Sequence, residues 1–256
     1  MSSLQQSMRV RGAAVPLAAC EPVSPCDGRR LMRSYESAAL LPDRTIAHAS
    51  HVAPALPLFE AATAAFARGT LIRTARGPVA IEDLLPGDRV ESSEGIQPVL
   101  WIGSTTYVPG VEDERSSLVA LSRITADTFG PGRPMADVLV GPAARMVMRR
   151  ERLRTLIGQD RVLVPVADFA DGDRIIRVSP AGAVQMYHLM LPRHGTLRVG
   201  GIEMESYHPG QTLGSAPEAL RALFLGMFPG IALLQDFGEL TLTRTTRKAL
   251  DGLIVM

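Results

Sequence analysis

Two short stretches decide which fold this sequence predicts: FARGTLI at residues 66–72 and VAIEDLLPGDRV at residues 79–90. In both, a few apolar or β-branched residues alternate with polar ones and stop at a glycine or proline. This pattern is typical of short strands joined by tight turns. It predicts three strands here, over residues 70–74, 79–81 and 89–92.

The same pattern continues towards the C-terminus. Further strands are expected over residues 99–102, 118–124, 138–140, 146–148, 162–166, 174–178, 184–190 and 196–199. Many short strands separated by turns predict a mostly β fold, in which the chain meanders through a compact domain. Trp101 lies in one of these apolar strands, and we expect it to anchor the core.

The composition excludes several classes of protein. With 256 residues and 46% hydrophobic side chains, the chain can bury one large core or two smaller ones. Its 27 basic and 26 acidic residues give a net charge of +1, which does not favour nucleic acid or an anionic membrane as a partner. Only Cys20 and Cys26 are present, which excludes a disulfide framework. No apolar run approaches the roughly 20 residues that a membrane-spanning helix needs.

The first 57 residues show no sustained periodicity and end in a group of prolines, so we expect a flexible or loosely docked tail. Arg9 and Arg11 precede a short apolar run that ends in LAAC at Cys20, which is similar to a lipoprotein cleavage box. The run is short and contains Pro16. We therefore expect a cytoplasmic protein by default, with export through this signal as the alternative.

The C-terminal residues 213–256 predict a short helical appendage. SAPE at residues 215–218 reads as a capping box, and apolar residues then follow at helical spacing up to Met227. A second helix is expected over residues 242–250, with Arg244, Arg247 and Lys248 on a solvated face. The basic run at residues 149–154 is expected to be an exposed loop or sheet edge whose charges stay solvated.

Several motifs, each weak alone, occur in a specific order. They are FARGT at residues 66–70, EDLLPGD at 82–88, QPVLWIG at 97–103, LVGPAAR at 139–145, VLVPV at 162–166, YHLMLPRH at 187–194 and ESY at 205–207. In this order the chain resembles the bacterial type of the Hint family, the hedgehog and intein autoprocessing domains. The resemblance implies a Hint-like twisted β-disc over residues 58–212.

The resemblance also implies a reaction. In this family a cysteine or hydroxyl residue at the start of the domain attacks the preceding carbonyl, and a histidine protonates the departing amide nitrogen. The nucleophile position falls on Ala65, and the family's Ser/Thr-x-x-His motif falls on Gly141 and Ala144. A methyl group cannot attack or donate a proton, so we expect no catalytic residue here to be active. Splicing would further need an asparagine, and the chain has none.

Two alternatives stay open at this point. Thr63 or Thr70 could serve as an unrecognised nucleophile in an active autoproteolytic domain, although a threonine needs an adjacent base. The chain could instead be an unrelated all-β binding module. If the Hint-like reading holds, a groove near Ala65 and Ala144 is expected to survive as a structural feature or as a binding site for an unknown protein partner.

The histidines and one acidic group need separate interpretation. His188 and His194 are six residues apart, so in a strand they would share a face, where they could retain acid–base chemistry or bind a metal. The favoured reading is a hydrogen-bonded inner His188 and a turn residue His194. Asp168, Asp171 and Asp173 are spaced loosely like a calcium loop but lack its later glutamate, so we expect a solvated acidic turn. We predict no metal site and no cofactor.

Overall fold

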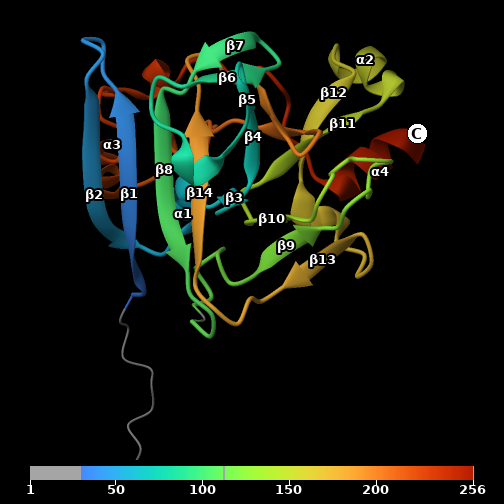
Figure 1. Cartoon of the computed structure of the whole chain (residues 1–256), viewed down its shortest axis with the longest axis horizontal. Helices are drawn as coiled ribbons and strands as arrows, with labels where there is room; N and C mark the ends of the chain where they lie inside the picture. Colours follow the sequence, from blue (N-terminus) through green and yellow to red (C-terminus); the bar gives the residue numbers. More distant parts are fainter. Residues whose placement is uncertain (1–29, 112, 256) are drawn as a thin grey trace, which may run out of the picture.

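The computed structural model describes residues 30–111 and 113–255, and side chains up to residue 252. Two large antiparallel sheets form the molecule (Figure 1). The first has the order β13-β9-β10-β3-β14-β8-β1-β2. Its strands are β1 (Met32–Leu40), β2 (Ile46–Pro54), β3 (Phe66–Ala67), β8 (Trp101–Tyr107), β9 (Leu121–Ile124), β10 (Val138–Val140), β13 (Ile175–Val178) and β14 (Val184–Met190).

The second sheet has the order β12-β11-β16-β15-β4-β6-β7, and β5 pairs with β4. Its strands are β4 (Leu71–Thr74), β5 (Gly77–Ala80), β6 (Arg89–Ser92), β7 (Gly95–Pro98), β11 (Arg145–Arg149), β12 (Arg161–Pro165), β15 (Thr196–Val199) and β16 (Ile202–Glu205). The helices are α1 (Pro57–Thr63), α2 (Glu151–Ile157), α3 (Glu218–Gly226) and α4 (Arg247–Val255), with 3-10 turns η1 (Ile81–Asp83), η2 (Val166–Phe169) and η3 (Leu234–Phe237). The mostly β fold is confirmed, and β6, β10, β14 and β15 have the predicted bounds.

The main core lies where the two sheets face each other. Phe66 and Val140 come from the first sheet, and Met146, Leu197 and Val199 come from the second; all five are buried in one apolar cluster. Side chains alternate across each strand, so a strand with one polar face supplies every second residue to this cluster. Burial of such side chains contributes roughly 25 cal/mol per Å² of apolar surface, which makes this cluster the main source of stability.

Strands β1 and β2 correct one expectation. Residues 32–54 were predicted to belong to a flexible or loosely docked tail, but they form a hairpin. Its first strand pairs with β8, with Tyr35 opposite Thr105 at one end of the ladder and Ala39 opposite Trp101 at the other. The hydrophobic pattern is weak because the buried face of β1 carries Arg33 and Ser37 beside Tyr35 and Ala39. Residues 1–29 of the predicted tail, including Cys20 and Cys26, lie outside the described residues.

A second core joins this hairpin to the C-terminal helices. Tyr35 of β1, Phe59 of α1 and Trp101 of β8 share an apolar cluster with Phe224 and Phe228. Trp101 is fully buried, as predicted; its ring stacks on Phe228 at 4.2 Å between centroids, and its Nε1 donates to the Met227 carbonyl at 2.7 Å. Figure 1 shows α3 behind β1 and β2. The hairpin and the segment around α3 therefore stabilise each other.

Three local predictions in the helical parts are wrong. The expected capping box does not form, because Ser215 Oγ donates to the Thr212 carbonyl and α3 begins after Pro217. Most of the basic run at residues 149–154 is neither a loop nor a sheet edge, since residues 151–154 lie in α2, which buries Leu153; the charged side chains of the run are exposed, as expected. The last helix begins at Arg247 rather than at residue 242, which leaves Arg244 in an extended segment that contacts β12 at Leu163.

Helix α1 is fixed by a buried carboxylate. Glu60 accepts hydrogen bonds from Arg33 Nε at 2.9 Å and from Ser116 Oγ at 2.6 Å. It also accepts from the backbone N–H of Ser117 at 2.6 Å and from the Ser117 hydroxyl at 2.7 Å. Glu60 is fully buried and Arg33 is 7% exposed, so each charge needs the other to compensate for its loss of hydration. One side chain thus ties the hairpin and α1 to the loop before β9.

Candidate functional site

Ala65, the expected nucleophile position, lies immediately before the short strand β3, which pairs with β10 and β14. Its N–H donates to the Tyr187 carbonyl at 3.0 Å, and its carbonyl accepts from the Gly141 N–H at 2.8 Å. The Ala144 N–H in turn donates to the Gly141 carbonyl at 3.1 Å. The structure therefore brings together the three positions that the resemblance singled out, Ala65, Gly141 and Ala144.

The space around these positions is closed. Ala65 is fully buried and Ala144 is 2% exposed, and both belong to the main core. A β-carbon added to Gly141 would collide with the carbonyl oxygen of Ala64. Ala65 and Ala144 themselves therefore do not border an open groove. The reason is that small side chains let the backbone segments around residues 64 and 141 approach each other directly.

This close approach makes a testable prediction. Replacing Gly141 by serine, a hydroxyl residue of the family pattern, should lower the free energy of unfolding by about 2–3 kcal/mol, because a backbone carbonyl must move. Gly182→Ser is the matched control: nothing lies within 4 Å of its added β-carbon, so its stability should change by less than about 0.5 kcal/mol. Urea unfolding measures both values. Equal stability of the two variants would contradict the closed arrangement.

The two threonines proposed as substitute nucleophiles have different surroundings. Thr63 is fully buried, and its hydroxyl donates to the Phe59 carbonyl at 3.2 Å within α1. Thr70 lies just before β4, where its N–H donates to the Ala67 carbonyl and its carbonyl accepts from Ile81. The Thr63 hydroxyl therefore donates its hydrogen to a carbonyl oxygen. A carbonyl oxygen is too weak a base to activate a nucleophile.

His188 belongs to β14, where it is buried next to Tyr187, the residue that pairs with Ala65. Its Nδ1 faces the Ala61 carbonyl of α1 at 2.9 Å, and its ring contacts Phe66 and Tyr207 edge-on. Burial lowers the pKa of His188 to about 4, although the Ala61 carbonyl opposes the shift. Because a carbonyl only accepts, Nδ1 carries the hydrogen, and the neutral ring has its lone pair on Nε2. Nε2 is buried and has no hydrogen-bond partner among the residues that the structure describes.

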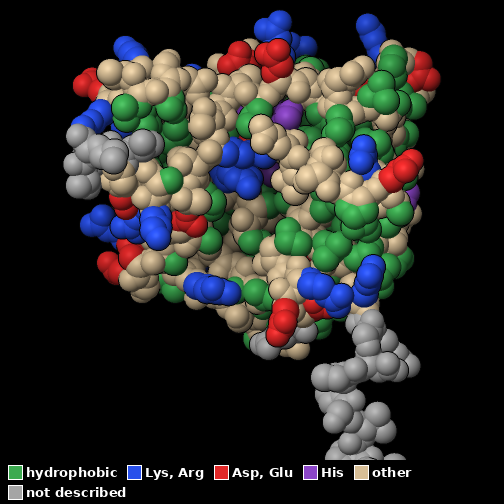
Figure 2. Space-filling model, turned by 180° about the vertical axis from the view of Figure 1, so that it is seen from behind, with side chains coloured by type: hydrophobic (Ala, Val, Ile, Leu, Met, Phe, Trp, Pro, Cys, Tyr) green, Lys and Arg blue, Asp and Glu red, His purple; other side chains and the backbone are tan. Residues whose placement is uncertain are grey.

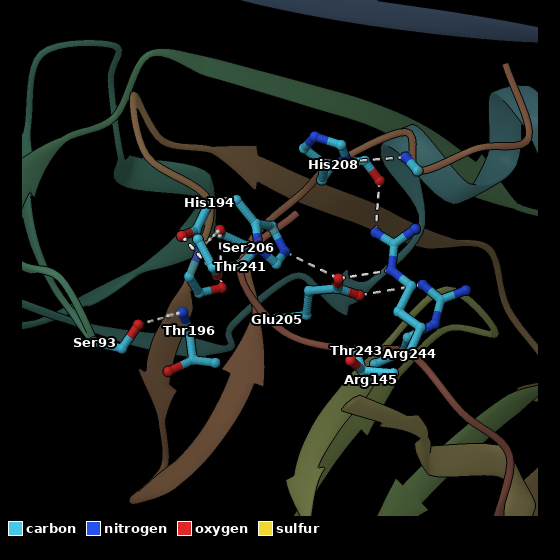
Figure 3. A network of polar contacts seen from close by, with 12 residues as sticks. Ser93, Arg145, His194, Thr196, Glu205, Ser206, His208, Thr241, Thr243 and Arg244 are labelled. Atoms are coloured by element: carbon cyan, nitrogen blue, oxygen red, sulfur yellow. Dashed lines mark hydrogen bonds and ion pairs between the residues drawn. The ribbon is translucent and has the colours of Figure 1, made fainter. Parts of the chain in front are cut away.

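His194 belongs to a separate network around Glu205 (Figure 3). His194 Nε2 lies 3.0 Å from Glu205 Oε1, and Nδ1 accepts from the Thr241 N–H at 3.2 Å. Arg244 Nε and Arg145 Nη1 reach the same carboxylate at 2.8 Å and 3.2 Å. In Figure 3 the histidine approaches Glu205 from one side and the arginines from the other. Arg244 is therefore an ion-pair partner of a buried acid and not part of a solvated face.

These contacts set the protonation state of Glu205. Burial alone would raise its pKa, but the hydrogen bond from His194 and the charges of Arg244 and Arg145 outweigh burial and lower the pKa to about 2. Glu205 is thus ionised at neutral pH. The sequence supplied the ESY motif that contains it, but nothing in the sequence indicated that Arg244, 39 residues away, is its partner.

The described residues contain no group of three His, Cys, Asp or Glu side chains arranged to hold a metal ion. His188 and His194 have different partners, an α1 carbonyl and the Glu205 carboxylate. In the acidic turn, Asp171 Oδ1 accepts from the backbone N–H groups of residues 173–175 at 2.8 to 3.0 Å. Its oxygens therefore stabilise the turn itself.

Comparison with known proteins identifies the domain. The family model described as the Hint domain matches residues 64–211, which is more than half of the chain and begins next to Ala65. The chain belongs to the Hint domain family. The match covers the closed centre, His188 and Glu205, whereas the β1–β2 hairpin and the helices α1, α3 and α4 lie outside it.

Solved structures similar to this Hint domain are inteins and an intein-like domain. The bacterial intein-like domain from Clostridium thermocellum is 16% identical, with 57% of this chain and 99% of that chain covered and a TM-score of 0.37. The gp41-1 intein is 11% identical, with 56% and 99% covered and a TM-score of 0.35. The MchDnaB-1 intein is 11% identical, with 56% and 100% covered and a TM-score of 0.33.

A search of curated proteins gave no match. Within the described part of the chain, no helix has both the length and the apolar character needed to cross a membrane.

Proposed function

We propose that this Hint domain does not cleave itself and serves as a structural or binding module. The observation that carries the proposal is the closed centre: methyl groups at Ala65 and Ala144, and a glycine at 141 that leaves no room for a side chain. The Ala65 nitrogen, which would have to be protonated as a leaving group, donates its hydrogen to the Tyr187 carbonyl. That carbonyl cannot deliver a proton.

The segment before Ala65 supports the same proposal. In a self-cleaving domain it would be released, but here β1, β2 and α1 supply five of the thirteen buried residues of the second core. The buried Arg33–Glu60 pair and the β1–β8 ladder hold the same segment. A cut before Ala65 would therefore leave both fragments bound to each other under native conditions.

The experiment follows the mass of the full chain over several days under denaturing detection, with and without thiol or hydroxylamine. We expect the wild type to stay intact. A fragment that ends at Ala64 would contradict the proposal, and so would one that ends at Ala62 or Gly69, the residues before Thr63 and Thr70. Thr63→Val and Thr70→Val would then show which hydroxyl attacks. Native size measurement alone would miss such a cut, because the hairpin stays docked.

A double variant, Ala65→Cys with Ala144→His, tests why the domain does not cleave itself. It restores the thiol and the imidazole of the family pattern while Gly141 keeps its contact with Ala64. Thiol-dependent cleavage of this variant beside an intact wild type would assign the loss to the missing side chains. If both proteins stay intact, the backbone contact at Gly141 is sufficient to block the reaction.

A further inference from the structure

Strand β2 forms one edge of the first sheet, and it lacks the features that normally protect an edge. It is nine residues long, and its sequence IAHASHVAP has no lysine, arginine, aspartate or glutamate and no proline before the last position. Figure 1 places it at the outer margin of the sheet, with no described element beyond it. A long uncharged edge strand offers a row of unpaired backbone groups to another chain, and proteins usually block such edges.

The other sheet edges that the structure describes are blocked in one of the usual ways. β13 and β7 have four residues each, and β13 carries Arg177. β5 is also four residues long and contains Pro78. β12 is covered, because its Leu163 exchanges backbone hydrogen bonds at 2.9 Å with Thr243 and Thr245 of the segment before α4. β2 is therefore the exception among these edges.

The direction of the backbone groups of β2 follows from the bonds at the two ends of the hairpin. The Leu41 N–H donates to the Thr45 carbonyl at 2.9 Å, and the Ala55 N–H donates to the Leu31 carbonyl at 2.8 Å. Bonded and non-bonded pairs alternate along an antiparallel ladder, so the odd-numbered residues of β2 bond to β1. The N–H and C=O groups that point to the free edge are therefore those of Ile46, His48, Ser50 and Val52. Among the described residues, nothing outside the hairpin bonds to them.

The same four positions carry the exposed side chains of β2. Ile46 is 37% exposed and Val52 is 66% exposed, so two large apolar side chains lie along the open edge. The opposite face is held by α3, where His51 Nε2 lies 2.8 Å from the Gly226 carbonyl. Seen from behind in Figure 2, hydrophobic side chains gather on the side where α3 covers the hairpin. Exposed apolar side chains beside unpaired backbone groups are typical of an interaction site.

We propose that a second copy of this chain pairs with β2 through its own β2, antiparallel and about a two-fold axis at Ala49. In this register Ile46 lies opposite Val52 of the second copy, and His48 lies opposite Ser50. Each opposed pair exchanges two hydrogen bonds, so the four pairs make about eight. Specific interfaces contain about 5–15 hydrogen bonds, so this number is sufficient for a dimer. The apolar side chains of Ile46 and Val52 also pack against each other across the strands.

The residues of β2 favour this register over its neighbours. A pairing centred on Ser50 would set Ile46 opposite Pro54, which has no N–H and whose carbonyl already accepts from Leu56 at 2.8 Å. A pairing centred on His48 would keep only three opposed pairs. A two-fold pair also closes after two copies, so it covers both edges and exposes no new one. The hairpin lies outside the residues that match the Hint domain, and the pairing does not depend on whether the domain cleaves itself.

Sedimentation equilibrium of the full chain, from about 5 to 500 μM, tests the pairing. We expect the mean mass to rise from that of one chain towards that of two. Val52→Lys places a charge on the edge and should weaken association at least about tenfold. Ile96→Lys is the matched control, because Ile96 is 49% exposed on β7 in the other sheet, and it should associate as the wild type does. A wild-type chain that stays monomeric, or an equal effect of the two lysines, would overturn the proposal.

A disulfide reports the register. In a chain with Cys20→Ser and Cys26→Ser, Ala49→Cys places two thiols across the two-fold axis, with α-carbons about 4.5 Å apart, which a disulfide can bridge. Ala47→Cys is the control, because its two copies would lie four residues apart along the strands, about 13 Å. Under mild oxidation we expect a covalent dimer from Ala49→Cys alone. Equal cross-linking of the two variants, or none in either, would contradict the pairing at Ala49.

Discussion

Replacing Glu60 by alanine is expected to lower the free energy of unfolding by about 3–5 kcal/mol, the largest effect of any substitution considered. The carboxylate is fully buried and accepts from Arg33, Ser116, Ser117 and Leu118. Its removal leaves the Arg33 guanidinium buried without a counter-ion. It also leaves the hydroxyl and backbone donors of the 116–118 loop without their acceptor.

Glu36→Ala on β1 is the matched control for Glu60→Ala. Glu36 is exposed on the strand that carries Arg33, so its removal should change stability by less than about 0.5 kcal/mol. Urea unfolding gives both values. A loss below about 1 kcal/mol for Glu60→Ala would mean that the hairpin and α1 do not depend on this carboxylate. It would also remove one reason for treating the segment before Ala65 as a fixed part of the domain.

The second large effect is expected at Glu205. Glu205→Ala should cost about 3 kcal/mol, because it leaves Arg145 and Arg244 facing each other with no negative charge between them. Their side chains are 26% and 21% exposed, so water screens part of the repulsion and the effect stays at the lower end of the range for buried pairs. Glu203→Ala, on the same strand, removes only a pair with the exposed Arg149 and should cost less than about 1 kcal/mol.

The same residue predicts how stability changes with pH. The folded protein lowers the pKa of Glu205 from its ordinary 4.5 to about 2, so the unfolded chain takes up a proton first as the pH falls. Its stabilising contribution is fully present above pH 4.5 and is lost as the pH drops from 4.5 towards 2. Wild type and Glu205→Gln should therefore converge in stability over this interval. A constant difference between them across it would contradict the assignment.

The strands of the Hint domain could be predicted closely because their signal is local. In β14, residues 184–190 are mostly apolar and stop two residues before Pro192, and the structure reproduces the predicted bounds. The hairpin β1–β2 could not be predicted in this way. Its buried face mixes Arg33 and Ser37 with Tyr35, so the period of two is present in the fold but not in the hydrophobicity.

The candidate site also has features that the sequence predicts and features that it does not. Which side chains occupy positions 65, 141 and 144 is a property of the sequence, and so is the absence of a thiol or imidazole there, because reactivity belongs to the residue type. The closure of the backbone around Gly141, the lone pair of His188 and the pairing of Arg244 with Glu205 were decided only by the tertiary structure. The physical reason is that these features depend on contacts between segments distant in the chain, where packing and desolvation fix the partner and no local pattern encodes it.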